Sequence, residues 1–332
     1  MSCITRAIKF GAPASRYFVK KTYDPRHGTI ASPQGPESHQ HIEMETIVGR
    51  NESSARKFQW NTIIWVSLFH LFSAVALFYI SWQNIAITLV LLWLSVSPGI
   101  GLGYHRLLTH RGFKTPRWVE RTLAAFGTLA LQSGPVSWVT THRIHHAFTE
   151  TENDPHSPER GLFWAHIGWI FRGAGNTPTR ETMERYSPDL VKDPVLMFLD
   201  KFYWLQSILL GVILWLAFDL EAVLWGVFVR TVLGWHITWL VNSATHTWGS
   251  RRFDTRDSST NSLIIGLLAF GEGWHNNHHA HPRSSRHGLT WKEFDFNWIQ
   301  IKIMRMLRLA KDVYAFDIKS DAVNSTKLNK SV

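Results

Sequence analysis

The sequence contains a single cysteine, Cys3, among its 332 residues. One thiol cannot form an intramolecular disulfide, so the fold does not depend on disulfide bonds and suits a reducing compartment. No apolar segment follows Met1, and its absence argues against a secretory signal peptide. No internal repeat, heptad run or low-complexity tract is evident either, which argues against repeat and coiled-coil architectures.

Residues 1–58 form a polar arm with clusters of Pro, Gly and Ser, as in ASPQGPESHQH. This composition predicts a mobile or loosely docked segment. Basic residues precede the first acidic residue, Asp24, a feature shared with organelle transit peptides; they are Arg6, Lys9, Arg16, Lys20 and Lys21. Residues 316–332 are a C-terminal tail, which leaves 59–315 as one domain.

The rest of the chain separates into apolar and charged blocks. Hydrophobic residues make up 45% of the sequence, with 17 Trp and 20 Phe, and the segregation is typical of a membrane protein with large aqueous parts. Four apolar stretches come close to the roughly 20 residues that a helix needs to cross a bilayer. They are 61–82, 85–104, 202–218 and 222–242, and we expect them to cross as two hairpins.

Lys and Arg are unevenly distributed around these stretches. There are nine in 1–60, twelve in 105–201 and thirteen in 249–332, and none in the hairpin loops 83–84 and 219–221. Since basic loops stay on the cytoplasmic side, both termini and the middle segment are predicted to lie on the cytoplasmic or stromal face. The net charge of +10 fits this topology and contact with anionic head groups. No nucleic-acid-binding module is visible, so no nucleic-acid partner is expected.

Three histidine clusters follow the spans on that charged face. They read HRLLTH at 105–110, HRIHH at 142–146 and HNNHH at 275–279. The second and third share the spacing i, i+3, i+4, which places three imidazoles on one face of a helix. Converging imidazoles are typical of a metal site. Eight or more neutral nitrogens exceed the capacity of one ion, so we expect two ions, and an all-nitrogen dinuclear site beside lipid favours iron and dioxygen chemistry.

The first cluster has a different spacing from the other two. His105 and His110 are five residues apart, and an α-helix would splay their side chains by about 140°. Either they serve two different ions or the helix frays between them. His246 follows Asn242 by four residues, so the two share a helical face at the end of the fourth stretch. Spacing alone leaves open whether they are ligands or an ordinary polar pair.

Other polar residues near the clusters have possible supporting roles. Metal-bound histidines usually donate their second N–H to a carboxylate, and the acidic neighbours are Glu150, Glu152, Asp154 and Glu272. Plain surface charge is the alternative for each. Arg230 and His236, inside the fourth stretch, indicate either a functional group or a tie to a neighbouring helix. His70 is expected to be a hydrogen-bonded interior histidine. Four histidines without cluster spacing are left outside the site: His156, His166, His281 and His287.

Taken together, the motifs resemble the membrane fatty acid desaturases of the delta-9 (stearoyl) group, most closely their cyanobacterial and plant acyl-lipid branch. The matching stretches lie in the family's order over residues 60–312 and read GYHRLLTHRGFKTP, THRIHHAFTETENDPHSPERGLFWAHIGW, KDPVLMFLDKFYW, VNSATHTWGSRRF and FGEGWHNNHHAHPRSSRHG. The resemblance implies an all-α integral membrane protein with four transmembrane helices in two hairpins and a cytoplasmic helical cap that carries a di-iron site.

The family pattern also implies the ligands and cofactors. Two iron ions would be held by nine histidines, with dioxygen as co-substrate: His105, His110, His142, His145, His146, His246, His275, His278 and His279. Asn242 matches a family asparagine that reaches one iron through water. The chain reads HPR at 281–283 and has no HPGG-like haem motif, so electrons are expected from a separate donor, either a ferredoxin or a b-type cytochrome.

The implied reaction inserts a cis double bond, at delta-9, into a saturated acyl chain carried by lipid or CoA. An apolar tunnel would hold one C–C bond against the irons. Candidate walls are Trp138, Trp235, Trp239 and Trp274, although a core or interfacial aromatic is the favoured interpretation of each one taken singly. A membrane di-iron hydroxylase of lipids or hydrocarbons is the alternative enzyme, and a metal-ion carrier or sensor the alternative class. The DPHSP and KDPV stretches favour the desaturase, and clusters outside the spans disfavour a carrier.

Overall fold

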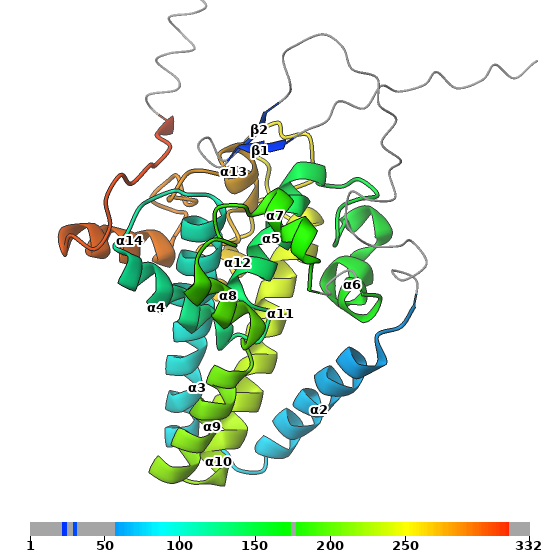
Figure 1. Cartoon of the computed structure of the whole chain (residues 1–332), viewed down its shortest axis with the longest axis vertical. Helices are drawn as coiled ribbons and strands as arrows, with labels where there is room; N and C mark the ends of the chain where they lie inside the picture. Colours follow the sequence, from blue (N-terminus) through cyan, green and yellow to red (C-terminus); the bar gives the residue numbers. More distant parts are fainter. Residues whose placement is uncertain (1–21, 25–28, 32–56, 174–176, 319–332) are drawn as a thin grey trace, which may run out of the picture.

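The computed structural model describes residues 22–24, 29–31, 57–173 and 177–318. Helices dominate them, which confirms the predicted helical class, and long helices stand below a cap of short ones (Figure 1). A small antiparallel hairpin of β1 (Thr22–Asp24) and β2 (Thr29–Ala31) was not expected from the sequence. Most of the predicted arm and tail lies outside the described residues.

Two helical stretches, Trp82–Thr109 and Leu220–His246, are long and apolar enough to cross a membrane. They correspond to the second and fourth predicted stretches. Each changes its winding along its length, and each ends at a histidine-bearing segment of the cap. The first stretch consists of α3 (Trp82–Leu94) and the π-helix η2 (Ser95–Thr109). The second consists of α10 (Leu220–Val223), the π-helix η5 (Leu224–Val229), α11 (Arg230–Ser243) and the 3-10 helix η6 (Ala244–His246).

The first and third predicted stretches form shorter helices. α2 (Trp60–Ala76) has 17 residues, about 26 Å of helix against a hydrocarbon core of about 30 Å. α8 (Pro194–Lys201) and α9 (Leu205–Ala217) meet at a 68° bend and count as one broken span or a re-entrant segment. Among the described residues, two helices are thus able to cross a membrane, or three if the bent pair is one span. Exposed large apolar side chains on these helices, such as Trp65 and Leu216, are typical of a lipid-facing surface.

Short helices form the cap above the long ones (Figure 1). The two short apolar runs of the sequence, 123–131 and 262–270, overlap α4 and α12. The cap helices are α4 (Arg117–Thr128), α5 (Pro135–Phe148), η3 (Pro158–Arg160), η4 (Trp164–Gly168), α6 (Trp169–Phe171), α7 (Arg180–Tyr186), α12 (Leu263–Leu268), α13 (His275–Ala280) and α14 (Phe296–Met306).

Glycines let the first crossing helix approach the cap closely. A Cβ atom on Gly99 would lie 2.6 Å from the backbone nitrogen of Gly127, a distance that real Cβ atoms do not adopt. Only glycine at position 99 therefore allows η2 to lie this close to α4. The contact fixes the end of η2, where His105 and His110 are located, against the cap.

Buried charges position α5, which carries the HRIHH motif. Asp200 accepts the backbone N–H of Ser137 at 2.7 Å and its hydroxyl at 2.8 Å, so a side chain from α8 caps the first turn of α5. Arg143 is fully buried, pairs with Asp189 at 2.7 Å and donates to the carbonyl of Leu108 at 2.7 Å. The second histidine motif is therefore tied both to the bent pair and to the end of η2.

Candidate metal centre

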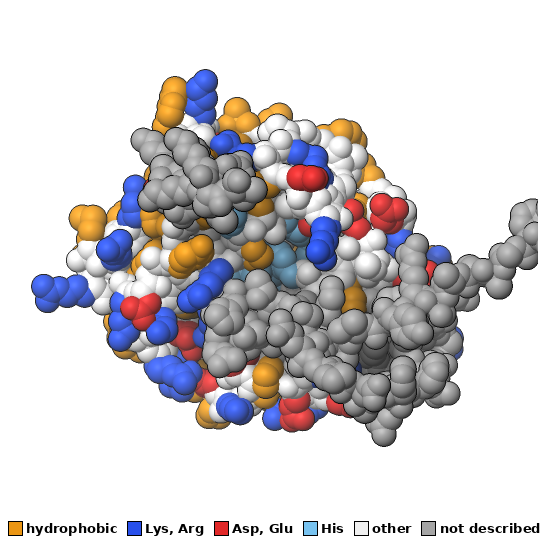
Figure 2. Space-filling view, turned by 90° about the horizontal axis from the view of Figure 1, so that it is seen from above, with side chains coloured by type: hydrophobic (Ala, Val, Ile, Leu, Met, Phe, Trp, Pro, Cys, Tyr) orange, Lys and Arg blue, Asp and Glu red, His pale blue; other side chains and the backbone are white. Residues whose placement is uncertain are grey.

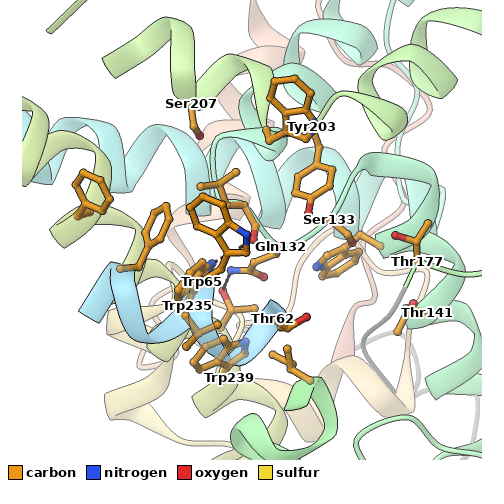
Figure 3. A pocket seen from close by; sticks show the side chains of 18 of the residues that line it. Thr62, Trp65, Gln132, Ser133, Thr141, Thr177, Tyr203, Ser207, Trp235 and Trp239 are labelled. Carbon is orange, nitrogen blue, oxygen red and sulfur yellow. Dashed lines mark hydrogen bonds between the residues drawn. The ribbon is translucent and has the colours of Figure 1, made fainter. Parts of the chain in front are cut away.

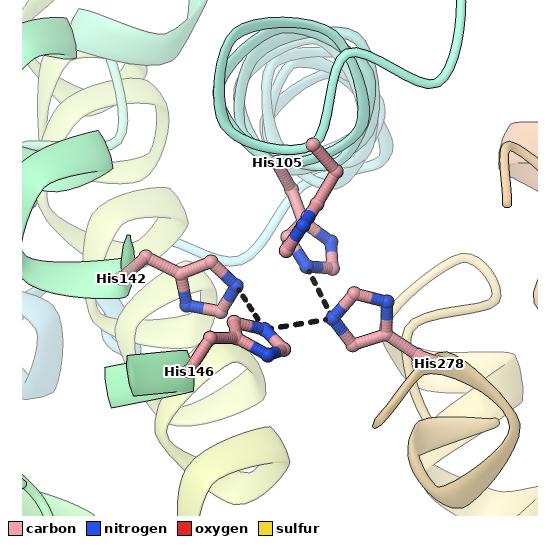
Figure 4. A group of neighbouring side chains, drawn as sticks. His105, His142, His146 and His278 are labelled. Carbon is pink, nitrogen blue, oxygen red and sulfur yellow. Dashed lines mark hydrogen bonds between the residues drawn. The ribbon is translucent and has the colours of Figure 1, made fainter. Parts of the chain in front are cut away.

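The structure brings all nine predicted histidines together into two groups. Within each group one ligand atom per residue lies within 4.8 Å of all the others. Figure 4 shows four members of the first group pointing toward one another from the end of η2, α5 and α13. The first group is His105, His110, His142, His146 and His278, and the second is His145, His246, His275 and His279.

π-helical winding explains how His105 and His110 join the same group. The backbone N–H of His110 bonds the carbonyl of His105 at 3.1 Å, a contact between residues five apart, and the two rings lie 4.9 Å from each other. A π turn holds more residues than an α turn and often occurs at functional sites. The 140° splay assumed α-helical winding, so neither fraying nor a division between two ions is needed.

Both histidine helices contribute to both groups. In α5, His142 and His146 belong to the first group and His145 to the second; in α13, His278 belongs to the first and His275 with His279 to the second. Each i, i+4 pair is joined by Nε2 atoms 3.1 Å apart. The i, i+3, i+4 spacing therefore divides one helix face between two neighbouring sites, which supports a dinuclear centre.

Carboxylates hold four of the nine histidines in one tautomer. The Nδ1 atoms concerned contact Glu272 at 2.5 Å (His105), Asp154 at 3.0 Å (His145), Glu150 at 3.0 Å (His246) and Asp257 at 2.8 Å (His279). Burial alone would raise the pKa of Asp257, but the hydrogen bond and charge of His279, together with hydrogen bonds from Ser259, outweigh it and lower that pKa. An ionised carboxylate only accepts, so each of these four Nδ1 atoms carries the proton and each Nε2 atom keeps its lone pair.

Three of these carboxylates were among the acidic neighbours named from the sequence. Glu152, the fourth, is exposed, and none of the described histidine contacts involves it. Asp257 was missed because it precedes His279 by 22 residues and no local spacing connects them. A loop returns it to the site.

The positions of the lone pairs fit a cation bound in the second group. His246 and His279 both carry their proton on Nδ1, and the Nε2 atom of each lies 3.1 Å from Nε2 of His275. His275 has at most one Nε2–H and cannot donate to both. At least one pair of facing lone pairs thus remains, and a bound cation would relieve their repulsion.

The distances between Nε2 atoms in the first group also fit a bound ion. Nε2 of His278 lies 3.1 Å from Nε2 of His105 and 3.0 Å from that of His146 (Figure 4). Neighbouring nitrogens around an octahedral ion with bonds of about 2.1 Å are about 3.0 Å apart. Both nitrogens of His110 and Nε2 of His145 are buried without a hydrogen-bond partner among the described residues. Such orphaned nitrogens fit metal ligation.

Neutral imidazoles are the form that binds metal, and the surroundings keep several of these rings neutral. Burial first, and neighbouring imidazoles second, hold the pKa of five rings well below the ordinary value near 6.5. These rings belong to His110, His142, His146, His275 and His278. The donor set, its tautomers and its spacing therefore fit two metal ions of the kind that imidazole prefers, iron among them.

An apolar cavity of about 800 Å³ lies beside the centre (Figure 3). Its described lining includes His142 and Asn242 but no Lys, Arg, Asp or Glu. Cavities of this size bury most of a lipid-sized ligand, and an uncharged wall suits a hydrocarbon chain. Three of the four predicted wall residues, Trp138, Trp235 and Trp239, line it. Trp274 does not: its ring packs against Gly266 and its N–H donates to the carbonyl of Phe294 at 2.9 Å.

A polar pair that crosses the cavity wall was not foreseen. Gln132 donates to the hydroxyl of Thr238 at 3.0 Å (Figure 3). The residues on either side of Gln132, Leu131 and Ser133, have φ angles of 52° and 76°, a strained left-handed conformation for residues other than glycine. Trp235 donates its indole N–H to the carbonyl of Ala130 at 3.0 Å, which helps to hold this turn. No spacing in the sequence connects position 132 with position 238.

The ionisable residues of the fourth stretch make ties to other segments. Arg230 is fully buried and donates to the carbonyls of Gly226, at 3.0 Å, and Leu129. His236 lies between His70, at 3.1 Å, and His166, at 3.0 Å. The structure thus favours the structural alternative for Arg230 and agrees with a hydrogen-bonded His70.

The histidines left outside the site from their spacing fall into two kinds. His166 joins the row with His236, and His281 stacks on Phe316 with ring centres 3.5 Å apart. His156 and His287 instead lie against the two groups, with 5% and 1% of their surfaces exposed. From the cap side, histidine side chains are visible in the surface with Lys and Arg around them (Figure 2).

Comparison with known proteins agrees with this geometry. Residues 80–295 match the family model described as fatty acid desaturase. The sn-1 stearoyl-lipid 9-desaturase of Anabaena variabilis is 46% identical over 239 residues, which cover 72% of this chain and 87% of the relative. The chloroplastic palmitoyl-monogalactosyldiacylglycerol delta-7 desaturase of Arabidopsis thaliana is 42% identical over 245 residues, 74% of this chain and 66% of the relative.

A relative named for a CoA substrate is similar as well. The icosanoyl-CoA 5-desaturase of Limnanthes douglasii is 39% identical over 275 residues, 81% of this chain and 77% of the relative. The family match and these identities confirm the resemblance seen in the histidine motifs. The chain belongs to the fatty acid desaturase family and is an oxidoreductase that inserts a double bond into a fatty acyl chain.

Proposed function

We propose that this enzyme inserts a cis double bond at delta-9 of a saturated acyl chain with two irons held by nine histidines. The observation that carries the proposal is that the histidines form two groups beside an uncharged cavity. Within each group, neighbouring Nε2 atoms lie 3.0–3.1 Å apart. Two ions explain why facing lone pairs are tolerated in a buried site. The cavity explains where a hydrocarbon chain is held.

Each iron has its own set of protein ligands in this proposal. Five histidines of the first group bind one ion, and the four of the second group bind the other. Asn242 lines the cavity and, in this proposal, would reach one of the irons through a water. When bound, a reduced iron pair supplies the dioxygen-derived oxidant that can attack an unactivated C–H bond.

The residues of the chain orient the substrate and exclude water. His142 is the one member of the nine that lines the cavity among the described residues, so the reacting carbons lie at its side. Two C–H bonds break in the reaction. The two hydrogens, with two electrons and two protons from outside, reduce one dioxygen to two waters. Holding a single C–C bond at the centre is a positioning effect, and the cavity walls provide it.

The delta-9 position is supported by the relative from Anabaena variabilis, which is named a 9-desaturase. Relatives of comparable identity are named for positions 7 and 5 and for lipid or CoA carriers. Small differences in cavity shape therefore decide the position, and the acyl carrier is either a lipid or CoA. A separate one-electron donor, a ferredoxin or a b-type cytochrome, supplies the electrons.

We infer a membrane topology of four spans in two hairpins for a single domain of residues 59–315. Trp82–Thr109 and Leu220–His246 are the longer span of each hairpin. α2 and the bent pair α8–α9 are the shorter partners, and their exposed apolar side chains support contact with lipid. The cap, both termini and the metal centre then lie on the cytoplasmic or stromal side.

Expression in a strain that lacks unsaturated fats tests the reaction. We expect a monounsaturated product, and mass spectrometry of lipid and thioester fractions locates both the double bond and the carrier. An alcohol in place of an alkene would identify a hydroxylase.

Purified protein is expected to bind two irons tightly, which a metal carrier would not. His145→Ala and His278→Ala should each abolish product and lower the iron content while the protein still inserts; full activity in either variant would refute the ligand set.

A further inference from the structure

His156 and His287 occupy matching positions, one beside each histidine group. His287 and the predicted ligand His105 both face oxygen Oε2 of Glu272, with Nδ1 distances of 3.4 Å and 2.5 Å. A second carboxylate, Asp154, repeats the pattern. Its Oδ1 atom lies 3.0 Å from Nδ1 of His145 and 3.9 Å from Nδ1 of His156.

Ring contacts connect each of these histidines with one histidine group. His287 lies over His278 of the first group, with ring centres 4.6 Å apart and planes 39° from parallel. His156 lies over His145 of the second group, at 4.3 Å and 32°. Each group thus has one additional histidine beside it. His287 lies over His278 and shares Glu272 with His105. His156 lies over His145 and shares Asp154 with the same residue.

The backbone holds both additional rings in place. The N–H of His287 bonds Asp295 at 2.8 Å, and its carbonyl accepts from Asn277 of the HNNHH motif at 2.9 Å. The N–H of His156 bonds Asp154 at 3.1 Å, on the same oxygen that His145 contacts. The two rings are therefore placed by the segments that place the predicted ligands.

Neither ring has strong hydrogen bonds of its own. Both nitrogens of His287 and Nδ1 of His156 are buried without a hydrogen-bond partner among the described residues. With a proton on Nδ1, His287 points a weak donor at Glu272 from 3.4 Å, and His156 faces Asp154 from 3.9 Å.

We propose that His287 and His156 are positioning residues, one for each iron, that hold Glu272 and Asp154 in line with His105 and His145. Each ring occupies the second side of the shared carboxylate oxygen and closes it from water. The carboxylate then stays aimed at the Nδ1 atom of the ligand histidine, whose Nε2 atom is aimed at the iron. Partners of this kind typically change metal affinity or activity by about 10–100-fold when they are removed. This proposal depends on the di-iron site described under the proposed function.

Isosteric substitutions separate the hydrogen-bond donor from the shape of the side chain. His287→Asn and His287→Leu differ only in the amide group, which places an N–H near the original Nδ1 position. We expect the Leu variant to bind one of the two irons about 10–100-fold more weakly, and the Asn variant to bind both within threefold of the parent. His156→Leu and His156→Asn should repeat this for the other iron. His281→Leu, which removes a histidine stacked on Phe316, is the matched control and should leave affinity unchanged.

Two properties are measured: the iron content under chelator competition, and the Mössbauer spectrum of the ⁵⁷Fe-loaded protein. Size exclusion of the iron-free protein checks that each variant folds. Perturbation of one doublet by His287→Leu and of the other by His156→Leu supports the proposal. Leu and Asn variants that behave alike, or Leu variants with the parent's affinity and spectrum, overturn it. A parent protein that holds no iron would instead refute the proposed function. A parent that holds two irons and forms alkene, with unchanged Leu variants, would refute this inference alone.

Discussion

Arg230 lies inside a helix that is long and apolar enough to cross a membrane, and it donates a hydrogen bond to the carbonyl of Leu129 at the end of α4. The guanidinium is fully buried and also bonds the carbonyl of Gly226 at 3.0 Å. A cation at a helix C-terminus is stabilised by the unpaired carbonyls there. The contact fixes the start of the turn that presents Gln132 to the cavity. A buried charge in this helix is thus tied to the wall of the cavity.

Replacing this arginine should alter where the double bond forms. We expect Arg230→Met to loosen the turn at 129–133 and to yield a mixture of double-bond positions, because the cavity wall is no longer held. Arg230→Lys keeps the charge and one donor and should give an intermediate mixture. Iron content should stay at the parent's level in both. Mass spectrometry of the products measures the ratio of positions, and an unchanged ratio in Arg230→Met would contradict the role of this turn.

The hydrogen bond between Gln132 and Thr238 should affect the same property. Thr238→Val keeps the side-chain volume and removes the hydroxyl that Gln132 reaches at 3.0 Å. We expect a lower rate and a broader set of product positions, and the same result for Gln132→Leu. Because the two residues act through one contact, the double variant should be no worse than either single variant. Additive losses in the product assay would show that the two side chains act independently.

Asp189 should contribute more stability than a surface ion pair. It pairs at 2.7 Å with Arg143, which has no exposed surface and lies on the helix of the HRIHH motif. Asp189→Asn leaves that charge without its counter-ion, and breaking a buried pair in this way costs about 3 kcal/mol. The control is Asp312→Asn, which breaks an exposed pair with Lys114 and should change the stability little, because solvent screens the two charges. Thermal unfolding of the iron-free protein in detergent measures both, and equal losses would contradict the assignment.

The pKa of the Asp189 carboxyl predicts how the stability of the protein depends on pH. Burial alone would raise its pKa, but Arg143 and Arg111 lower it from 3.8 to about 2. A lowered pKa means that the unfolded chain binds this proton first as pH falls, so the contribution is complete above about pH 4 and is lost toward pH 2. It amounts to about 2 kcal/mol. The stability difference between parent and Asp189→Asn should therefore shrink over this interval, and a constant difference would refute the shift.

Local spacing in the sequence was sufficient for the helical class, the membrane character and the grouping of histidines in HRIHH and HNNHH. These features depend on helix periodicity and on the length of apolar runs, which neighbouring residues determine. The position of His110 could not be obtained in this way, because the spacing was interpreted with α-helical winding and the structure has a π-helix at η2. The same limit applies to Asp257, which a loop brings to His279.

Short stretches of the chain thus determine the number and kind of metal-binding groups. Which of them share an ion, which carboxylate orients each ring, and how the cavity is shaped are decided by contacts between residues far apart. Glu272 with His105, Gln132 with Thr238 and Arg230 with Leu129 are each separated by about 100 positions or more. Only the folded packing of helices brings such pairs within hydrogen-bond distance, because hydrogen bonds act over about 3 Å and no periodic pattern extends that far along a sequence.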